Sequence, residues 1–313
     1  MGSYLAEFLL ENNYRVWGLV RRSSTDNLSR IRHILGKIQI VRGDLTDQTS
    51  LDDAIKAVCP DEVYNLAALS FVADSWNQPF TMLDINGLGP VRLLEACRKH
   101  KPDIKFYQAS SSEMYGAVKE TPQREITPFN PKSIYGIAKL AAHWAVTNYR
   151  NSYGMFACAG ICFNAESERR GLEFVTRKIT YAVARIKHRL QDKLSLGNLN
   201  AIRDWGYAPE YVRAMFLMLQ QSKPDDFVIA TGEAHTVGEW VEAAFCHAGL
   251  NWLDHVVIDE SLRRPAEVDL LLGDATKARW GLGWEPKMKF EQIVKIMVDA
   301  DIELVKEGAN NVY

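Results

Sequence analysis

The most informative stretch of the chain is Lys105-Phe106-Tyr107-Gln108-Ala109-Ser110-Ser111-Ser112-Glu113. A short, mainly apolar run passes directly into small hydroxyl side chains and an acid. Runs of this kind are typical of strands in a parallel sheet that helices cover on both faces. Such open α/β sheets bind ligands beyond the carboxyl ends of their strands. We therefore expect Ser110–Glu113 to lie at a ligand site.

The same pattern recurs along the first half of the chain. Apolar runs at residues 16–20, 38–41 and 63–68 precede the stretch. Helical spacing separates these runs, and we expect a polar helix between the first two. Strands that alternate with helices predict βαβ units, hence an α/β fold with a doubly wound parallel sheet of the Rossmann type.

The pattern becomes irregular in the second half, where Arg, Trp and Gly grow frequent. We expect residues 1–163 to form the Rossmann domain, rejoined by about residues 200–235. Residues 164–313 are expected to form mainly a smaller C-terminal lobe that shapes the substrate site.

Composition excludes several classes of protein. The 313 residues carry a net charge of −2, which gives no support to a nucleic-acid binder or a polybasic membrane anchor. The five cysteines are few and odd in number, so we expect no disulfide framework, and we expect no metal ion because no zinc-type spacing occurs. No apolar run approaches 18 residues. The expectation is a cytoplasmic protein without nucleic-acid or membrane partners.

The beginning of the chain departs from this fold class. Dinucleotide-binding domains open with a strand and a glycine-rich turn before the first helix. This chain starts at Met1-Gly2-Ser3-Tyr4-Leu5, already entering a helix, so only Gly2 of the turn is present. We expect a gap in the sheet where the first strand would lie. Two explanations stay open: a sequence whose start lies further upstream, or a paralogue that binds cofactor poorly.

A candidate catalytic pair follows the strand-end hydroxyls. Tyr135 and Lys139 are four residues apart, so on a helix they lie on one face. A neighbouring lysine cation is expected to lower the pKa of the phenol and make Tyr135 a usable base. Together with Ser111 and Glu113, this pair predicts an active site at the carboxyl edge of the sheet.

These segments, with Asn65-Leu66-Ala67-Ala68, resemble the extended short-chain dehydrogenase/reductase family that modifies nucleotide sugars. Longer segments are similar to its GDP-mannose 4,6-dehydratase branch along essentially the whole chain. They are residues 20–24 (VRRSS), 163–171 (FNAESERRG), 174–178 (FVTRK), 197–206 (GNLNAIRDWG) and 264–273 (RPAEVDLLLG).

The resemblance implies that GDP-mannose is converted to GDP-4-dehydro-6-deoxy-D-mannose and water by internal redox with NADP. Tyr135 would take the 4-hydroxyl proton, and Ser111 would hydrogen-bond O4. Glu113 would remove the C5 proton, and Lys139 would hold the nicotinamide ribose. Two alternatives remain: a related GDP-sugar epimerase or reductase, which would need no base such as Glu113 for C5, and a degenerate nucleotide-sugar-binding paralogue.

Further residues are assigned to the two ligands. Arg21-Arg22 stand where NAD-specific folds have an acid, which favours the 2′-phosphate of NADP. The residues expected to bind the cofactor are Gly2, Arg21, Arg22, Ser23, Asp44, Leu45, Leu66, Ala67, Ala68, Ser70, Tyr135, Lys139 and Arg170. Those expected to bind GDP-mannose are Asn164, Lys178, Gly197, Arg203, Arg264 and Glu267. The resemblance also implies a homodimer or homotetramer.

Leu69 stands where that family commonly has Gln, and three further positions depart from the pattern that the resemblance implies. Ala165 stands where that family usually has His, and Ser111 stands where Thr is commoner. Glu168 replaces the usual Pro and is expected to put an acid beside the phosphates. The changes at Ala165 and Glu168 bear on ligand affinity rather than on the type of reaction.

Overall fold

The computed structural model describes residues 1–25, 28–263 and 266–308. Its centre is a four-stranded parallel sheet with the strand order β10-β5-β4-β3. The strands are β3 (Glu62–Asn65), β4 (Lys105–Ser111), β5 (Phe156–Cys162) and β10 (Phe227–Ile229). The expected α/β fold with a parallel sheet is confirmed.

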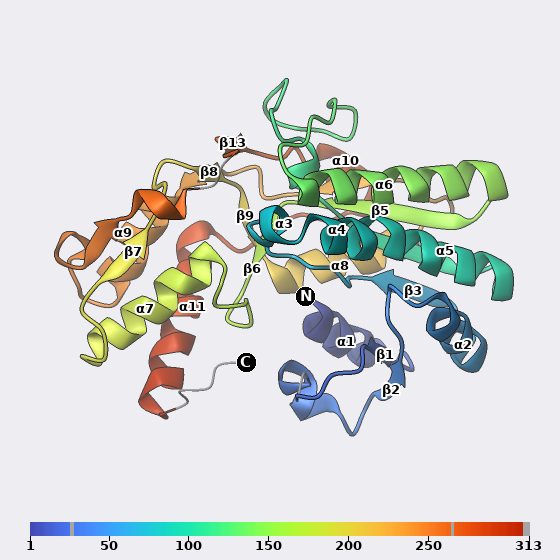
Figure 1. The fold of residues 1–313 in the computed structure, drawn as a ribbon, viewed down its shortest axis with the longest axis horizontal. Helices are drawn as coiled ribbons and strands as arrows, with labels where there is room; N and C mark the ends of the chain where they lie inside the picture. Colours follow the sequence, from blue (N-terminus) through green and yellow to red (C-terminus); the bar gives the residue numbers. More distant parts are fainter. Residues whose placement is uncertain (26–27, 264–265, 309–313) are drawn as a thin grey trace.

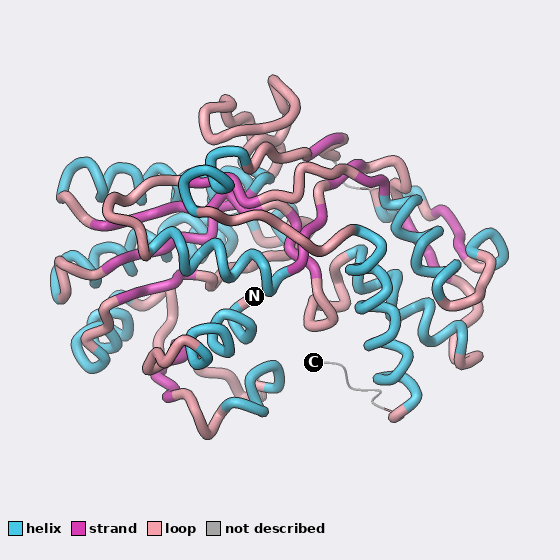
Figure 2. The backbone as a smooth tube through the Cα atoms, turned by 180° about the vertical axis from the view of Figure 1, so that it is seen from behind, coloured by secondary structure: helices cyan, strands magenta, loops and turns pink. Residues whose placement is uncertain are grey.

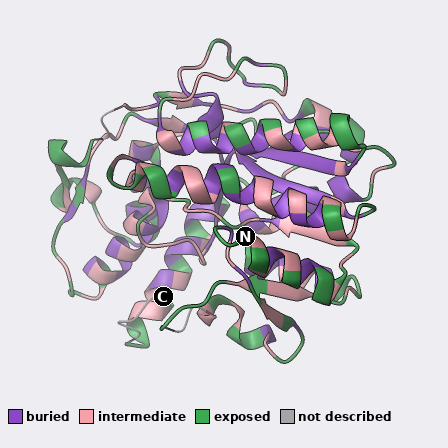
Figure 3. Cartoon of the chain, turned by 45° about the vertical axis from the view of Figure 1, so that its right-hand side comes forward, coloured by how far each residue is buried: buried purple, intermediate pink, exposed green. Residues whose placement is uncertain are grey.

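Strand β4 shows why an apolar run forms a central strand here. Its side chains alternate between two cores: Phe106 packs with helices α2 (Gln48–Val58) and α5 (Gly89–His100), and Tyr107 packs on the opposite face. Because both faces are covered, apolar side chains are needed on both sides of the strand. Figure 3 shows these central strands buried between helices whose outer faces are exposed.

Helices cover the two faces of the sheet in separate sets. Helix α6 (Ile134–Tyr153) lies with α2 and α5 on one face. Helices α1 (Gly2–Glu11), α8 (Ala208–Leu219) and α10 (Thr276–Leu282) share a core on the other. Figure 2 shows the strands running between these layers when the molecule is seen from behind.

The parallel sheet is interrupted. Strands β1 (Trp17–Val20) and β2 (Gln39–Arg42) form a separate parallel pair that shares no ladder with β3 in the described residues. This is the expected gap between the first apolar runs and the rest of the sheet. The prediction of a polar helix between these two strands is wrong, because the described residues there form only the 3-10 helix η1 (Ser29–Ile34).

The C-terminal lobe packs three helices together, α7 (Val175–Lys187), α9 (Val237–His247) and α11 (Phe290–Lys306). Its small sheets are β6 (Asn164–Glu166) with β9 (Trp205–Tyr207), β7 (Leu194–Leu196) with β12 (Val256–Ile258), and β8 (Ile202–Arg203) with β11 (His235–Thr236) and β13 (Leu270–Leu271). Figure 1 shows this lobe beside the α/β part, with the beginning of α1 between them.

The remaining short elements connect the larger ones. They are α3 (Asp74–Asn77), α4 (Pro79–Leu83), the π-helix η2 (Asp84–Leu88), and the 3-10 helices η3 (Ser112–Met114), η4 (Trp252–Asp254) and η5 (Glu260–Leu262). Among the described helices, none is both long and apolar enough to cross a bilayer.

Candidate active site

The end of β4 and the start of α6 bring together four side chains that the sequence singled out. Ser111 ends β4, Glu113 follows in η3, and Tyr135 and Lys139 lie in the first turns of α6. Helix α6 begins after Ser133, whose Oγ accepts a hydrogen bond from the Gly136 amide at 3.0 Å. This cap fixes the helix start directly beside Glu113.

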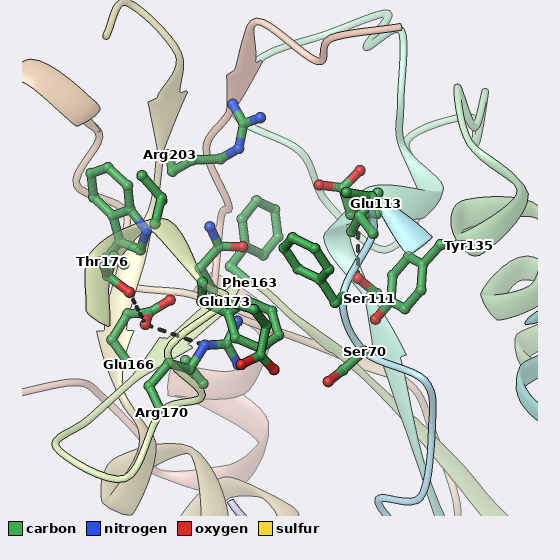
Figure 4. Close-up of a pocket in the computed structure, with 18 of the residues that line it drawn as sticks. Ser70, Ser111, Glu113, Tyr135, Phe163, Glu166, Arg170, Glu173, Thr176 and Arg203 are labelled. Carbon is green, nitrogen blue, oxygen red and sulfur yellow. Dashed lines mark hydrogen bonds and ion pairs between the residues drawn. The ribbon is translucent and has the colours of Figure 1, made fainter. Parts of the chain in front are cut away.

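Gly136 lets α6 approach η3 closely. A Cβ atom at this position would lie 2.7 Å from the Glu113 carbonyl oxygen, which is closer than a side chain tolerates. The glycine inside the Tyr-x-x-x-Lys motif therefore sets how near Tyr135 and Glu113 lie. Figure 4 shows Ser111, Glu113 and Tyr135 grouped on one side of a pocket.

This pocket lies between the α/β part and the lobe and has a volume of about 340 Å³. Thirteen of the residues predicted to act or bind line it. They are Leu66, Ala68, Ser70, Ser111, Glu113, Tyr135, Lys139, Asn164, Arg170, Lys178, Gly197, Arg203 and Glu267.

Other predicted residues lie outside the lining. Gly2 is the first residue of α1, next to Met1, which does line the pocket. Arg21, Arg22 and Ser23 directly follow the carboxyl end of β1.

The remaining predicted residues follow the neighbouring strands. The Asp44 carboxylate accepts two hydrogen bonds from Thr46, which lower the pKa of Asp44. The Leu45 side chain belongs to the buried core, and the Ala67 amide donates to the Asn65 side chain at 3.3 Å. Arg264 lies outside the described residues.

Burial dominates the protonation of the catalytic pair. It raises the pKa of Tyr135 to about 12, and a hydrogen bond with Ser111 only partly opposes this effect. It also lowers the pKa of Lys139 to about 8, and Lys139 Nζ donates to the Ala109 carbonyl at 2.9 Å. The expected lowering of the phenol pKa is therefore wrong for the protein alone, because desolvation penalises both charged forms.

The opposite wall carries cations. Arg203 Nη2 lies 3.2 Å from Glu267 Oε1, and Lys178 Nζ donates to the Ser195 carbonyl at 2.8 Å. Burial lowers the pKa of Lys178. At Gly197 a Cβ atom would lie 3.0 Å from the Leu262 carbonyl oxygen, so the backbone itself forms the wall there.

Arg170 enters the pocket from the loop that follows β6. Its guanidinium lies 3.5 Å from the centre of the Phe174 ring, and its Nε lies 3.4 Å from Glu166 Oε2. The same Glu166 carboxylate accepts a hydrogen bond from Thr176 at 2.6 Å. Figure 4 shows Glu166, Arg170 and Glu173 across the pocket from Tyr135.

Glu168 does not line the pocket, and the expectation of an acid beside the phosphates stays a prediction. Its Oε1 instead accepts a hydrogen bond from the Tyr4 hydroxyl at 2.6 Å. The side chain is turned toward α1 because the phenol offers a donor there.

Comparison with known proteins identifies the family of this chain. The family model described as GDP-mannose 4,6 dehydratase matches residues 1–297. The chain belongs to this family. It is 55% identical to GDP-mannose 4,6 dehydratase 1 of Arabidopsis thaliana, covering 97% of this chain and 88% of that protein. It is 48% identical to GDP-mannose 4,6 dehydratase of Homo sapiens, covering 99% of this chain and 90% of that protein.

Among solved structures, the chain is similar to the UDP-glucose 4-epimerase of Thermus thermophilus in complex with NAD. The TM-score is 0.84 at 26% identity, and the match covers 96% of this chain and 95% of the other. The resemblance to the GDP-mannose 4,6-dehydratase family is thereby confirmed, and so is the wider nucleotide-sugar-modifying fold.

The sequence analysis of this family member missed Asn86. This buried residue lies in the π-helix η2, and its side-chain amide both accepts from the Leu69 amide and donates to the Leu69 carbonyl, each at 2.8 Å. It therefore holds the loop after β3 against η2, which itself packs on α6. A π-helix has no sequence periodicity that would reveal it, although such bulges are frequent at functional sites.

Glu166 and Phe174 were also missed as pocket residues. Both lie inside segments that the resemblance rests on, and both line the pocket. Phe174 packs edge-on against Phe71 at 5.7 Å between ring centres, which joins the lobe to the loop after β3.

Proposed function

We propose that the protein converts GDP-α-D-mannose to GDP-4-dehydro-6-deoxy-α-D-mannose and water, with NADP as its cofactor. The observation that carries this proposal is the shared pocket, which is lined by Ser111, Glu113 and Tyr135 together with the cations Lys178 and Arg203. A hydroxyl, an acid and a phenol serve the sugar, and the cations suit a nucleoside diphosphate. Membership of the GDP-mannose 4,6-dehydratase family supports the same substrate.

The residues present fit the cofactor. Lys139 lines the pocket with Tyr135, and Leu66 and Ala68 also line it. Arg21 and Arg22, at the end of β1, would meet a 2′-phosphate, which favours NADP over NAD. When bound, the cofactor supplies hydride acceptance from C4 of the sugar and hydride return to C6.

Tyr135 and Ser111 serve the C4 hydroxyl. Tyr135 takes the hydroxyl proton, while Ser111 hydrogen-bonds the developing charge on O4. Burial keeps Tyr135 a phenol in the protein alone. In the proposed reaction the Lys139 cation, oriented toward the ribose, favours the phenolate.

Glu113 serves C5 and C6. Its side chain is 8% exposed and lines the same pocket. The carboxylate removes the C5 proton, which is acidic beside the new C4 carbonyl, and then donates a proton to the departing 6-hydroxyl. The atoms balance as loss of one water.

The GDP end lies against the lobe. Lys178, Arg203 and Arg264 would neutralise the diphosphate, and Glu267 would accept from the ribose hydroxyls. Asn164 and Gly197 complete this set. In this proposal residues 1–163, rejoined by about 200–235, form the cofactor-binding domain, and residues 164–313 form mainly the GDP-sugar-binding lobe.

The protein would act in the cytoplasm as a homodimer or homotetramer. All five cysteines are free, which suits a reducing compartment. Ile137 and Trp144 lie seven residues apart on α6 and are 44% and 55% exposed, and α6 packs on α4, where Phe80 is 86% exposed. A second copy of the chain would cover these apolar side chains.

The deciding experiment is mass spectrometry of the nucleotide sugar after incubation of the protein with GDP-mannose and NADP⁺. A product lighter by one water is expected. A product of unchanged mass that separates from GDP-mannose on chromatography before the mass spectrometer would instead identify an epimerase. Unchanged GDP-mannose would contradict the proposal.

Variants assign the roles. Tyr135→Phe should reduce turnover by at least about a hundredfold, because an acid–base group commonly contributes that much. Tyr149→Phe is the matched control, since Tyr149 lies on the same helix but donates to Glu95, outside the pocket lining, at 3.0 Å. Glu113→Gln should stall after oxidation at C4, with reduced cofactor accumulating and no loss of water. Full dehydration by that variant would place the elimination base elsewhere.

A further inference from the structure

The loop between β6 and α7 contacts both halves of the molecule through Glu168. The Tyr4 hydroxyl, in the first turn of α1, donates to Glu168 Oε1 at 2.6 Å. Tyr4 is 7% exposed, and burial and this hydrogen bond both raise its pKa. Tyr4 is therefore a phenol that donates to Glu168 across the physiological pH range.

We propose that this hydrogen bond is a latch that holds the first turn of α1 against the pocket, so that Glu168 and Tyr4 are positioning residues for the cofactor. The inference rests on the proposed function, because it concerns the cofactor that the pocket is proposed to bind. Neither side chain lines the pocket. Both act through the backbone elements that they join.

Arg169 strengthens the same contact from the next position along the loop. Its guanidinium lies 4.1 Å from the centre of the Tyr4 ring. Its Nη1 donates to Ser3 Oγ at 3.0 Å and to Glu7 Oε1 at 2.5 Å. Glu168 and Arg169 therefore grip three residues of α1, at positions 3, 4 and 7, which share one face of the helix.

The loop itself is anchored in the lobe. Arg177 on α7 donates to the carbonyl oxygens of Glu168 and Arg170, and its Nε bonds the Asp301 carboxylate on α11 at 2.7 and 2.8 Å. Both side chains of this ion pair are almost fully buried. A buried ion pair with two hydrogen bonds holds the loop in one arrangement.

On its inner side the loop carries Arg170 into the pocket, opposite Tyr135. The latch on the outer side and Arg170 on the inner side are only two residues apart. The position of α1 is therefore coupled to the position of Arg170 through a loop that Arg177 holds.

The first turn of α1 lies where it can contact an anionic part of the cofactor. The helix begins beside the pocket and has no acidic residue in its first turn. Its amide groups and helix dipole favour an anion there. Loss of the Tyr4–Glu168 hydrogen bond would loosen the first turn of α1 relative to Arg170, and the affinity for the cofactor would fall.

The test measures the affinity of the protein for NADP⁺ by tryptophan fluorescence or calorimetry. The affinity for GDP, measured in the same way, probes the other end of the pocket. Tyr4→Phe should weaken NADP⁺ binding by about three- to tenfold, which corresponds to the net contribution of a typical hydrogen bond. GDP binding should stay unchanged. The ring that Arg169 covers is retained in this variant.

Tyr14→Phe is the matched control. The Tyr14 hydroxyl donates to Glu62 at 3.3 Å, just beyond the other end of α1 and outside the pocket lining. Both variants lose one phenol–carboxylate hydrogen bond, so a merely structural effect would move the two melting temperatures alike and leave NADP⁺ binding equal. Equal NADP⁺ binding by the two variants would overturn the latch.

A second pair of variants keeps the test independent of how Tyr4→Phe folds. Glu168→Gln keeps an acceptor for the Tyr4 hydroxyl and should retain near-parental NADP⁺ binding, whereas Glu168→Leu should not. Similar NADP⁺ binding by these two folded variants would overturn the latch. Failure of the parent protein to bind NADP⁺ would instead overturn the proposed cofactor, and with it the latch.

Discussion

At the scale of single residues, Lys139 is an ionisable side chain buried at the active site. It is 4% exposed, and burial lowers its pKa from 10.5 to about 8. Between pH 8 and 10.5 the unfolded chain binds this proton more tightly than the folded protein does. The free energy of unfolding contributed by Lys139 therefore rises with pH through this window.

We predict that Lys139→Met stabilises the cofactor-free protein most at pH 7 and progressively less toward pH 10. At pH 7 the parent holds a buried cation, and the variant does not. Urea unfolding at pH 7, 8, 9 and 10 measures the difference. Subtracting parent from variant removes the opposing contribution of buried groups such as Cys97, whose raised pKa of about 12 is common to both proteins. A difference that does not change with pH would show that folding does not shift the pKa of Lys139.

At the scale of elements, the contact between α6 and η3 decides the geometry of the reacting groups. Gly136 permits it, since a Cβ there would lie 2.7 Å from the Glu113 carbonyl oxygen. Helix propensity alone favours alanine over glycine by about 1 kcal/mol. Close packing against a backbone oxygen opposes that preference.

We predict that Gly136→Ala lowers both the melting temperature and turnover, because α6 must move away from η3 and carry Tyr135 from Glu113. Overpacking of this kind costs about 1–3 kcal/mol. The matched control is Gly238→Ala in α9, where the nearest atom to an added Cβ is the Leu199 carbonyl oxygen at 3.5 Å, an ordinary contact. That variant should be as stable as the parent or more so. A stabilised, fully active Gly136→Ala protein would contradict the close approach.

At the scale of the whole molecule, the exposed apolar side chains of α4 and α6 bear on assembly. We predict that Trp144→Arg separates the proposed oligomer into monomers, because a buried cation without a partner is costly at an interface. Light scattering after size-exclusion chromatography measures the mass. Trp280→Arg is the control, since Trp280 is 87% exposed but lies on α10, on the opposite face of the sheet. Equal masses for the two variants would exclude α6 as the interface.

The local features of this protein could be read from its sequence. Strand β4 alternates between two apolar cores, and short-range spacing puts Tyr135 and Lys139 on one helix face, so both follow from periodicity. The hydroxyl and acid at the end of β4 follow from the rule that strand ends hold ligands. Neither inference needs knowledge of which distant segments meet.

Contacts between distant segments were decided by the tertiary structure alone. Glu168 accepts a hydrogen bond from Tyr4, 164 residues away in the chain, a contact that no local pattern predicts. Burial reversed the expected direction of the Tyr135 pKa shift, because desolvation depends on everything packed around the phenol. The π-helix that holds Asn86 has no periodic signature. Sequence fixes the local period of each element, but burial and long-range hydrogen bonds exist only once the elements have packed.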